Sequence, residues 1–548
     1  MAPNFRTSRH IQSKMKKITV FVAAVFVAFG LSAQVTTQAL SEQEKNLWHL
    51  RDMEKDGIPG VSAIRAYEEI LNNKQGKPVV VAIIDSGTET FHEDLQDVIW
   101  TNEDEIPNNG KDDDNNGYVD DVHGWSFIGG KGGDVEADNL EFTRIYRDLH
   151  RKYASVTPAN ITSKEGKAEY KRYEEMKAQM ESRVSEASTN ALQYAMIGMM
   201  YTNADKMLKR FFKAETLTVD MLANIPAGVD SLQESAELMN YAFENGFYNR
   251  IYTIADDAKA MTNQLETQLN IEFDPRHLVG DDYQNVNERL YGNNHIDGPA
   301  ADHGTHVGGC VGATWNGKGA AGVCNNARLM IIRCVPDGDE RDKDVANSIR
   351  YAVDNGARII NMSFGKSFSP QKSAVDEAIR YAESKGVLMI HAAGNDFKNT
   401  DKEANFPTDR YDAGGVCSTW MEIGASSSNV EMLSADFSNY GKKNVDVFSP
   451  GVDIYNSVPG QKYEAMSGTS MASPVAAGVA ATLMSYYPNL TAADVKKIMM
   501  ESAIPYKKHS FMVEMDGKMK KMKFKDMSRT GAIINLYKAC QMAESFKK

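Results

Sequence analysis

The chain has 548 residues, too many for one ordinary compact core, and its 42% hydrophobic and 25% charged content is near the average of globular proteins. Its 61 lysines and arginines against 74 aspartates and glutamates give a formal net charge of -13, so the sequence predicts neither nucleic acid nor anionic lipid as a partner. We therefore expect an acidic globular protein built from more than one part.

The N-terminal segment has the layout of a secretory signal peptide. Three lysines within 14–17 precede an apolar stretch at 18–30, and small residues follow. The apolar stretch is shorter than the ~20 residues that span a bilayer. We expect cleavage to remove 1–33, leaving a mature protein that begins with a short segment at 34–78, has no membrane span, and is periplasmic or extracellular. A buried N-terminal helix is the alternative.

From residue 79 onwards, apolar runs alternate with amphipathic stretches, which predicts an α/β fold with a parallel sheet and helices on both faces. Apolar side chains at helical spacing predict helices around 345–353 and 375–382, and Gly356 and Gly386 follow them at the positions of C-terminal caps. The expected strands lie at 79–84, 327–334, 358–362, 387–392, 420–425 and 445–448.

Residues 134–290 interrupt this alternation. They are rich in Glu, Lys, Met, Ala and Gln, and long helix-prone stretches occur around 163–213 and 229–270. We interpret this segment as a large all-helical insertion within an α/β domain formed by 79–133 and 291–548.

The five cysteines contain no CxxC pair, so the sequence signals neither a zinc site nor a redox motif. Buried free thiols are the favoured interpretation, and export would permit a disulfide.

Four polar residues are candidates for nucleophilic catalysis. A nucleophilic serine needs a base, an acid that orients the base, and donors for the oxyanion. Ser470 precedes an Ala-rich apolar helix, His303 lies in a glycine-rich segment at the start of another helix, and Asp85 and Asn395 each follow a predicted strand. Each has an ordinary alternative role in isolation, such as a helix cap for Ser470 or a turn for Asp85 and Asn395.

In these segments the sequence resembles the subtilisin family of serine proteases. Ile83-Ile-Asp-Ser-Gly87 is similar to the family's aspartate motif, His303-Gly-Thr-His-Val307 to its histidine motif and Gly468-Thr-Ser-Met-Ala-Ser-Pro474 to its serine motif, in the family's order. Ala392-Ala-Gly-Asn395 resembles its oxyanion segment, and Ile360-Asn-Met-Ser-Phe-Gly365 its substrate-strand segment. The resemblance covers roughly 79–130 and 291–505.

The resemblance implies a subtilisin-like fold and a serine-type endopeptidase that hydrolyses protein or peptide substrates through an acyl-enzyme intermediate, with no catalytic cofactor. By this match Asp85, His303 and Ser470 form the triad, and Asn395 with the backbone amide of Ser470 stabilises the oxyanion.

By the same match, Ser363, Phe364 and Gly365 pair with the substrate backbone as an added strand. The sequence also departs from the family. Phe364 stands where leucine is usual and would narrow the primary specificity pocket. The segment 34–78 is too short for the usual folded inhibitory prodomain.

An acidic loop follows the first strand. Asp112, Asp114, Asn116 and Asp120 place oxygens at positions 1, 3, 5 and 9 of a calcium-loop pattern that has glycine at position 6. His123 takes position 12, where an EF-hand has glutamate, so the loop is not an EF-hand. A structural calcium site and a solvated acidic turn are both consistent with this pattern.

The alternative from another functional class is a catalytically silent protein that binds a partner through the helical insertion. The presence of every triad and oxyanion residue argues against it. A lipase or esterase would need a GxSxG turn around Ser470 and the order Ser, Asp, His, and the sequence has neither.

Overall fold

A computed structural model describes residues 45–546 apart from 227 and 516. The predicted signal peptide, 1–33, lies outside the described residues. The described chain divides into two compact units, which we call the sheet unit (45–183 with 265–546) and the helical unit (184–264). Within the described residues, no helix is both long and apolar enough to cross a bilayer.

The sheet unit is built on a nine-stranded sheet in the order β12-β15-β9-β8-β7-β6-β1-β5-β2. All neighbouring strands in it are parallel except β12 and β15. The strands are β1 (Val79–Asp85), β2 (Gly124–Ser126), β5 (Ala327–Arg333), β6 (Ile359–Met362), β7 (Leu388–Ala392), β8 (Trp420–Ser426), β9 (Val447–Pro450), β12 (Ile504–Pro505) and β15 (Ala532–Ile533). The predicted α/β fold with a parallel sheet is confirmed.

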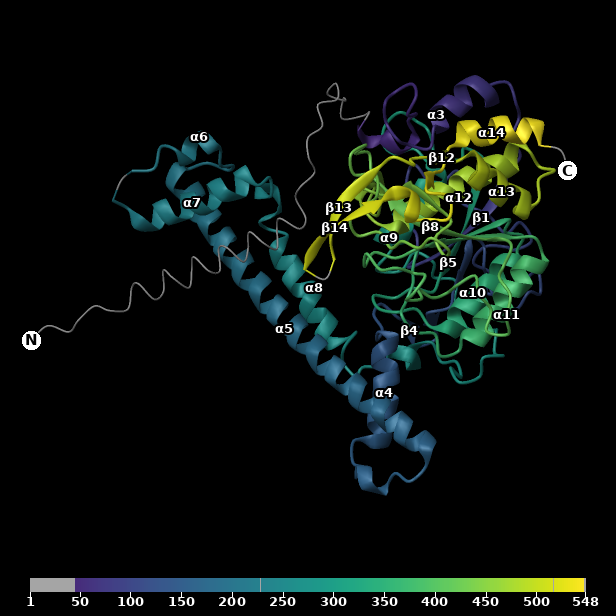
Figure 1. Cartoon of the computed structure of the whole chain (residues 1–548), viewed down its shortest axis with the longest axis horizontal. Helices are drawn as coiled ribbons and strands as arrows, with labels where there is room; N and C mark the ends of the chain where they lie inside the picture. The colour runs from purple at the N-terminus through teal and green to yellow at the C-terminus, as the bar shows by residue number, and fades with distance from the viewer. Residues whose placement is uncertain (1–44, 227, 516, 547–548) are drawn as a thin grey trace, which may run out of the picture. The chain divides into compact units, whose positions relative to one another are not determined.

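Helices cover both faces of this sheet, because successive side chains of a strand point to opposite faces. Val81 and Ile83 of β1 enter one core, and Ala82 and Ile84 enter another. Figure 1 shows β1, β5 and β8 between α12 and α13 on one side and α10 and α11 on the other. The covering helices are α9 (Asp302–Gly312), α10 (Asp342–Asp354), α11 (Lys372–Ser384), α12 (Thr469–Tyr486), α13 (Ala492–Ser502) and α14 (Leu536–Ser545).

Smaller elements complete the sheet unit. The smaller elements are η1 (Trp48–Leu50), α3 (Ala63–Ala66), η2 (Tyr67–Leu71), β3 (Gly129–Gly130), β4 (Gly133–Asp134), η3 (Pro158–Asn160), η5 (Pro275–Leu278), β10 (Ile454–Val458), β11 (Lys462–Met466), β13 (Ser510–Met515), β14 (Lys518–Lys523) and η6 (Phe524–Asp526).

All five cysteines are free and buried. Cys310, Cys324 and Cys540 lie in the core beneath α9 and α12, and Cys334 and Cys417 lie in the core beneath α10 and α11.

Helices of different lengths occupy most of the segment interpreted as an insertion. These are α4 (Glu141–Tyr153), the 49-residue α5 (Lys164–Phe212), α6 (Val219–Leu222), α7 (Asp230–Glu244), η4 (Tyr248–Arg250) and α8 (Ile254–Glu266). The helical unit has a core of its own, which includes Leu208, Met239 and Ile251. Residues 134–183 and 265–290 belong instead to the sheet unit.

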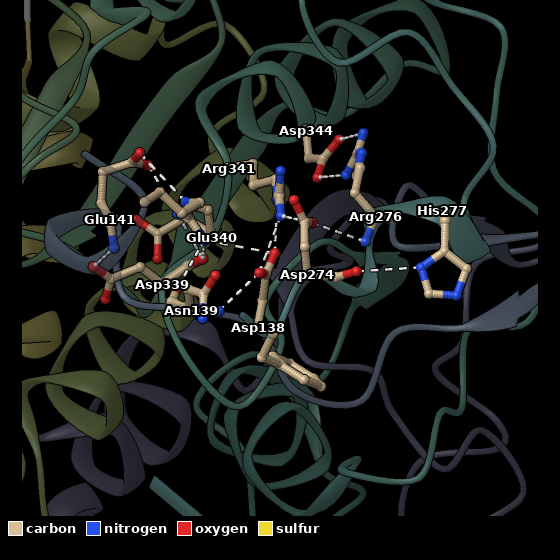
Figure 2. A network of polar contacts seen from close by, with 12 residues as sticks. Asp138, Asn139, Glu141, Asp274, Arg276, His277, Asp339, Glu340, Arg341 and Asp344 are labelled. Atoms are coloured by element: carbon tan, nitrogen blue, oxygen red, sulfur yellow. Dashed lines mark hydrogen bonds and ion pairs between the residues drawn. The ribbon is translucent and has the colours of Figure 1, made fainter. Parts of the chain in front are cut away.

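Buried ion pairs join these flanking residues to the strand and helix ends around α10 (Figure 2). Lys366 Nζ lies 2.9 Å from Glu141 Oε2 at the start of α4. Arg341 donates to both carboxylate oxygens of Asp138, at 2.6 and 3.0 Å. A second bidentate pair joins Arg276 and Asp344, at 2.6 and 2.8 Å. Each of these six side chains is at most 9% exposed, so each charge depends on its partner for compensation.

We predict that the two possible deletions in this region differ in their effect on folding. Replacing 184–264 with a Gly/Ser linker removes only the helical unit and should leave a cooperatively folded protein. Replacing 134–290 also removes the partners of Lys366, Arg341 and Asp344, and breaking one buried pair costs about 3–5 kcal/mol. Calorimetry should show a much lower melting temperature, or no cooperative transition, for the longer deletion. Equal melting temperatures for the two variants would contradict the structural role of these pairs.

Candidate active site

Asp85 ends β1, and its side chain is held by two donors. It is 1% exposed, and its Oδ1 accepts hydrogen bonds from the backbone N–H of Ser86 at 2.8 Å and from His303 Nδ1 at 2.6 Å. The strand before it is apolar and buried on both faces, so the carboxylate is the first polar group at the carboxyl end of β1. Asp85 therefore fixes one nitrogen of an imidazole at this edge of the sheet.

His303 is the second residue of α9, and its imidazole is 39% exposed. Gly304 permits this position, because a Cβ atom there would collide with the carbonyl oxygen of Gly87. Burial lowers the pKa of His303, but the charge of Asp85 and its hydrogen bond outweigh burial and raise the pKa above its ordinary value. With Nδ1 donating to Asp85, Nε2 carries the free lone pair of the neutral ring.

Ser470 is the second residue of α12, and Pro474 lies four residues after it. A proline has no N–H, so the carbonyl of Ser470 lacks its usual helical donor. Ser363 Oγ donates to this carbonyl at 2.9 Å. In return, Ser470 Oγ donates to the carbonyl of Ser363 at 3.1 Å. These reciprocal bonds hold the serine hydroxyl against the end of β6.

Two amide donors converge beside this serine. Asn395 Oδ1 accepts from the N–H and the Oγ1 of Thr469, each at 2.9 Å, which orients the carboxamide of Asn395. A Cβ atom at Gly468 would lie 3.5 Å from the backbone nitrogen of Ser470 and 3.7 Å from Asn395 Nδ2. The N-terminus of α12 adds partial positive charge at this point. Sequence reasoning did not single out Thr469, although its hydroxyl stands directly before Ser470.

The predicted substrate segment, 363–365, continues from β6. Ser363 Oγ accepts from Asn361 Nδ2 at 3.0 Å, and Asn361 Oδ1 accepts from Ser473 Oγ at 2.7 Å, so the segment is tied to α12. A Cβ atom at Gly365 would collide with the carboxamide of Asn405. Sequence reasoning missed Asn405, because it reaches this place from a loop forty residues further along the chain.

The structure brings the predicted residues together in two groups. Asp85 contacts His303, and Ser470 contacts Ser363 and lies beside Asn395. The hydroxyl of Ser470 donates to the Ser363 carbonyl, so it is not directed at His303. Both groups lie at the carboxyl ends of neighbouring strands, β1 and β6. In enzymes without bound substrate, catalytic hydrogen bonds are often long or poorly aligned.

His306 lies one turn after His303 and is fully buried. Its Nε2 is 2.8 Å from the carbonyl oxygen of Ile454, and burial lowers its pKa to about 4. This imidazole is therefore neutral at pH 7, and its place is that of a packing and hydrogen-bonding side chain.

In the acidic loop, the carboxylates that lie close together are not the set that the spacing of residues in the sequence suggests. Asp114 lies with Glu105 and Asp121, and one oxygen of each lies within 4.8 Å of the others. Asp112 accepts backbone N–H groups of its own loop, and Asp120 accepts those of 109–110. Among the four predicted ligands, only Asp114 belongs to the cluster.

Chemistry at this cluster fits a hard cation. Glu105 Oε2 is buried without a hydrogen-bond partner among the described residues, and burial raises the pKa of Asp121 to about 6. Asn116 donates its amide to both Asp114 and Asp121, and its own Oδ1 accepts from Tyr118. Three convergent carboxylate oxygens are the type of donor set that calcium prefers.

An Asp–His pair, a serine at a helix N-terminus and two convergent amide donors at one sheet edge are the groups that covalent serine catalysis requires. The profile of the subtilase family matches residues 76–527, which is more than half of the chain. The chain belongs to the subtilase family.

Individual relatives match shorter parts of the chain. The thermophilic serine proteinase of Bacillus sp. (strain AK1) is 39% identical over 186 residues, 34% of this chain and 43% of that protein. Subtilisin DY of Bacillus licheniformis is 34% identical over 203 residues, 37% of this chain and 70% of that protein. A solved protease structure from Pseudoalteromonas arctica PAMC 21717 is 29% identical, covers 44% of this chain and 70% of that one, and has a TM-score of 0.35. This chain therefore spans less than half the length of the first of these relatives.

We predict that Asp85→Asn lowers the pKa of His303 below its ordinary value. The substitution removes the charge that raises the pKa, while the burial that lowers it remains. Titration of the imidazole by NMR measures this directly and does not depend on turnover. Asp302→Asn is the matched control, because Asp302 is adjacent and exposed and should leave the His303 pKa nearly unchanged. A His303 pKa that is the same in wild type and Asp85→Asn would refute the coupling.

Proposed function

We propose that the protein is an exported serine endopeptidase that hydrolyses peptide bonds of protein or peptide substrates. The observation that supports this proposal is that the Asp85–His303 pair and the Ser470–Ser363 contact lie at the carboxyl ends of the neighbouring strands β1 and β6. The resemblance of 1–33 to a signal peptide supports export to the periplasm or the extracellular space.

In the proposed reaction, Ser470 Oγ leaves the Ser363 carbonyl, transfers its proton to His303 Nε2 and attacks the substrate carbonyl carbon. Asp85 keeps Nδ1 protonated and stabilises the imidazolium. The negative charge that develops on the substrate oxygen is stabilised by the Ser470 amide and Asn395 Nδ2. His303 then gives the proton to the leaving amine, whose C–N bond breaks, and a serine ester remains. Water activated by the same imidazole hydrolyses this ester and restores Ser470.

Substrate would bind by strand addition along 363–365. Among the described residues, the backbones of Phe364 and Gly365 make no hydrogen bonds, so their peptide groups are available to an extended chain. Backbone pairing tolerates many side chains, which suits a protease that acts on varied sequences. Phe364 packs 6.3 Å from the His391 ring, centroid to centroid, and is nearly buried, so it contributes a fixed apolar wall.

We also propose a structural calcium ion held by Glu105, Asp114 and Asp121. The unpartnered oxygen of Glu105 and the mutual repulsion of three carboxylates support a bound cation. Bound calcium would neutralise this repulsion and fix the loop between β1 and β2. It would take no part in the chemical step.

We expect Ser470→Ala and His303→Ala each to abolish peptide hydrolysis while leaving the fold intact, because the residues of a triad act as a unit. A fluorophosphonate probe should label the wild type at Ser470 and fail to label Ser470→Ala. Ser467→Ala is the matched control, since this exposed serine lies just before α12 and its hydroxyl forms hydrogen bonds only with Asp453 among the described residues. Residual proteolysis by purified Ser470→Ala at the wild-type rate would refute the mechanism. Labelling without hydrolysis of any peptide library would favour a binding role.

Calcium at a hundredfold excess over its Kd should stabilise the protein by about 2.7 kcal/mol, seen as a rise in melting temperature. Because Asp121 holds a proton below a pKa of about 6 in the folded protein, the gain should be small at pH 5 and grow as the pH rises through 6. Asp121→Asn should remove the calcium response, and Asp120→Asn should retain it. If Asp120→Asn removed the calcium response and Asp121→Asn retained it, the ligands would be those suggested by the loop spacing. If the wild type showed no calcium response, the proposed site would be refuted.

A further inference from the structure

A basic cavity of about 800 Å³ lies within the sheet unit, formed by α4, the start of α5 and the loops at 274–284 and 367–371. Three acidic residues line it, against twice as many arginines. The arginines are Arg144, Arg147, Arg151, Arg172, Arg276 and Arg341. The whole chain has a net charge of -13, so this concentration of guanidinium groups contrasts with the acidic composition of the protein.

Several of these arginines already have partners, and Figure 2 labels Arg276 and Arg341 among the residues of the network. Arg144 pairs with Glu141 at 2.8 Å. Of the lining acids, Glu141 is paired in this way and Asp274 is shared by Arg147 and Arg341. These four lining arginines are therefore compensated by carboxylates.

Two of the lining arginines, Arg151 and Arg172, lie outside this network of ion pairs, although the charge of Arg172 acts on Glu169 one turn before it. Arg151 and Arg172 are exposed and make no ion pair with any described residue, and Asp148 is the one lining acid left against them. Arg147 is 8% exposed, and its Nε has no hydrogen-bond partner among the described residues. Arg144, Arg147 and Arg151 follow a spacing of three and four residues, which puts them on one face of α4. The lining residues that form no ion pair therefore carry a net positive charge.

Tyrosines hold the two helices that carry these arginines. The rings of Tyr146 on α4 and Tyr173 on α5 stack at 6.1 Å with an interplanar angle of 5°. Tyr153 Oη donates to Glu169 at 2.6 Å. Arg151 and Arg172 are therefore presented by helices in fixed mutual contact, which reduces the ordering cost of binding a ligand.

This cavity adjoins the substrate segment at the end remote from Ser470. Ser363, at the near end, contacts Ser470, whereas the cavity begins at Ser367, two residues past Gly365. Lys366 and Phe406 pair through both of their backbone groups, at 3.0 and 2.8 Å, and Phe406 lines the cavity. An extended chain that pairs with 363–365 would reach the cavity with a residue several positions from the bond that is cut.

We propose that this cavity binds an acidic side chain of the substrate, an aspartate or glutamate several residues from the scissile bond. The inference rests on the proposed proteolytic function and specifies its substrate class. The planar guanidinium group donates two parallel hydrogen bonds to a carboxylate, a geometry that a lysine does not offer. Arg151 and Arg172 are the specificity-determining residues.

The test uses a positional series of fluorogenic peptides in which each remote position in turn holds Glu or Gln. At one position, the wild type should cleave the Glu peptide with a kcat/KM about five- to tenfold above that of the Gln peptide. This ratio should fall to about one in the Arg151→Gln/Arg172→Gln double variant. The Lys167→Gln/Lys171→Gln variant changes the net charge equally on α5, outside the cavity, and should keep the wild-type ratio.

Binding to Ser470→Ala, measured by fluorescence anisotropy of the same labelled peptides, tests the cavity without turnover. Tighter binding of the Glu peptide, weakened by salt and lost with Arg151→Gln/Arg172→Gln, supports the inference. Equal binding and equal cleavage of Glu and Gln peptides at every position would overturn it while leaving the proposed protease activity intact. Absence of cleavage of any peptide by the wild type would refute the activity, and the anisotropy comparison would still decide the cavity.

Discussion

The contact between the start of α12 and the end of β6 is the interaction on which the site depends. Pro474 removes one helical donor, and the carbonyl of Ser470 that is left over accepts from Ser363 Oγ. At this carbonyl, a side-chain hydroxyl replaces a backbone N–H as the hydrogen-bond donor. The N-terminus of α12, the hydroxyl of Ser470 and the segment 363–365 are thereby held together. Because a buried carbonyl without a donor is unfavourable, this hydrogen bond fixes the position of Ser470 relative to the end of β6.

A parallel sheet supplies the second constraint. Asp85 ends β1 and the segment 363–365 follows the adjacent β6, so both reach the carboxyl end of the sheet whatever lies between them in sequence. Asp85 and His303 are separated by 218 positions, yet their side chains lie 2.6 Å apart. The long intervening segment is tolerated because it leaves and re-enters without altering the pairing of β1 with β5 and β6.

Sequence patterns predicted the six central strands because both faces of the sheet are buried, so each strand is a continuous apolar run. The short β2 and β12 have no such run and were not predicted. In the acidic loop, spacing alone favoured Asp120, whereas the structure turns its neighbour Asp121 towards Asp114. The cavity could not be foreseen, because Arg151 and Arg172 meet the loop at 367–371 only through tertiary packing.

The reactivity of the five buried free cysteines reports on local opening of the folded protein. Three thiols lie in the core under α9 and α12, and two lie in the core under α10 and α11. Because a buried thiol is protected from reagents until its surroundings open, the order in which these cysteines become reactive would distinguish the loosening of one face of the sheet from that of the other. The two layers of the molecule can thus be followed separately during unfolding without any engineered label.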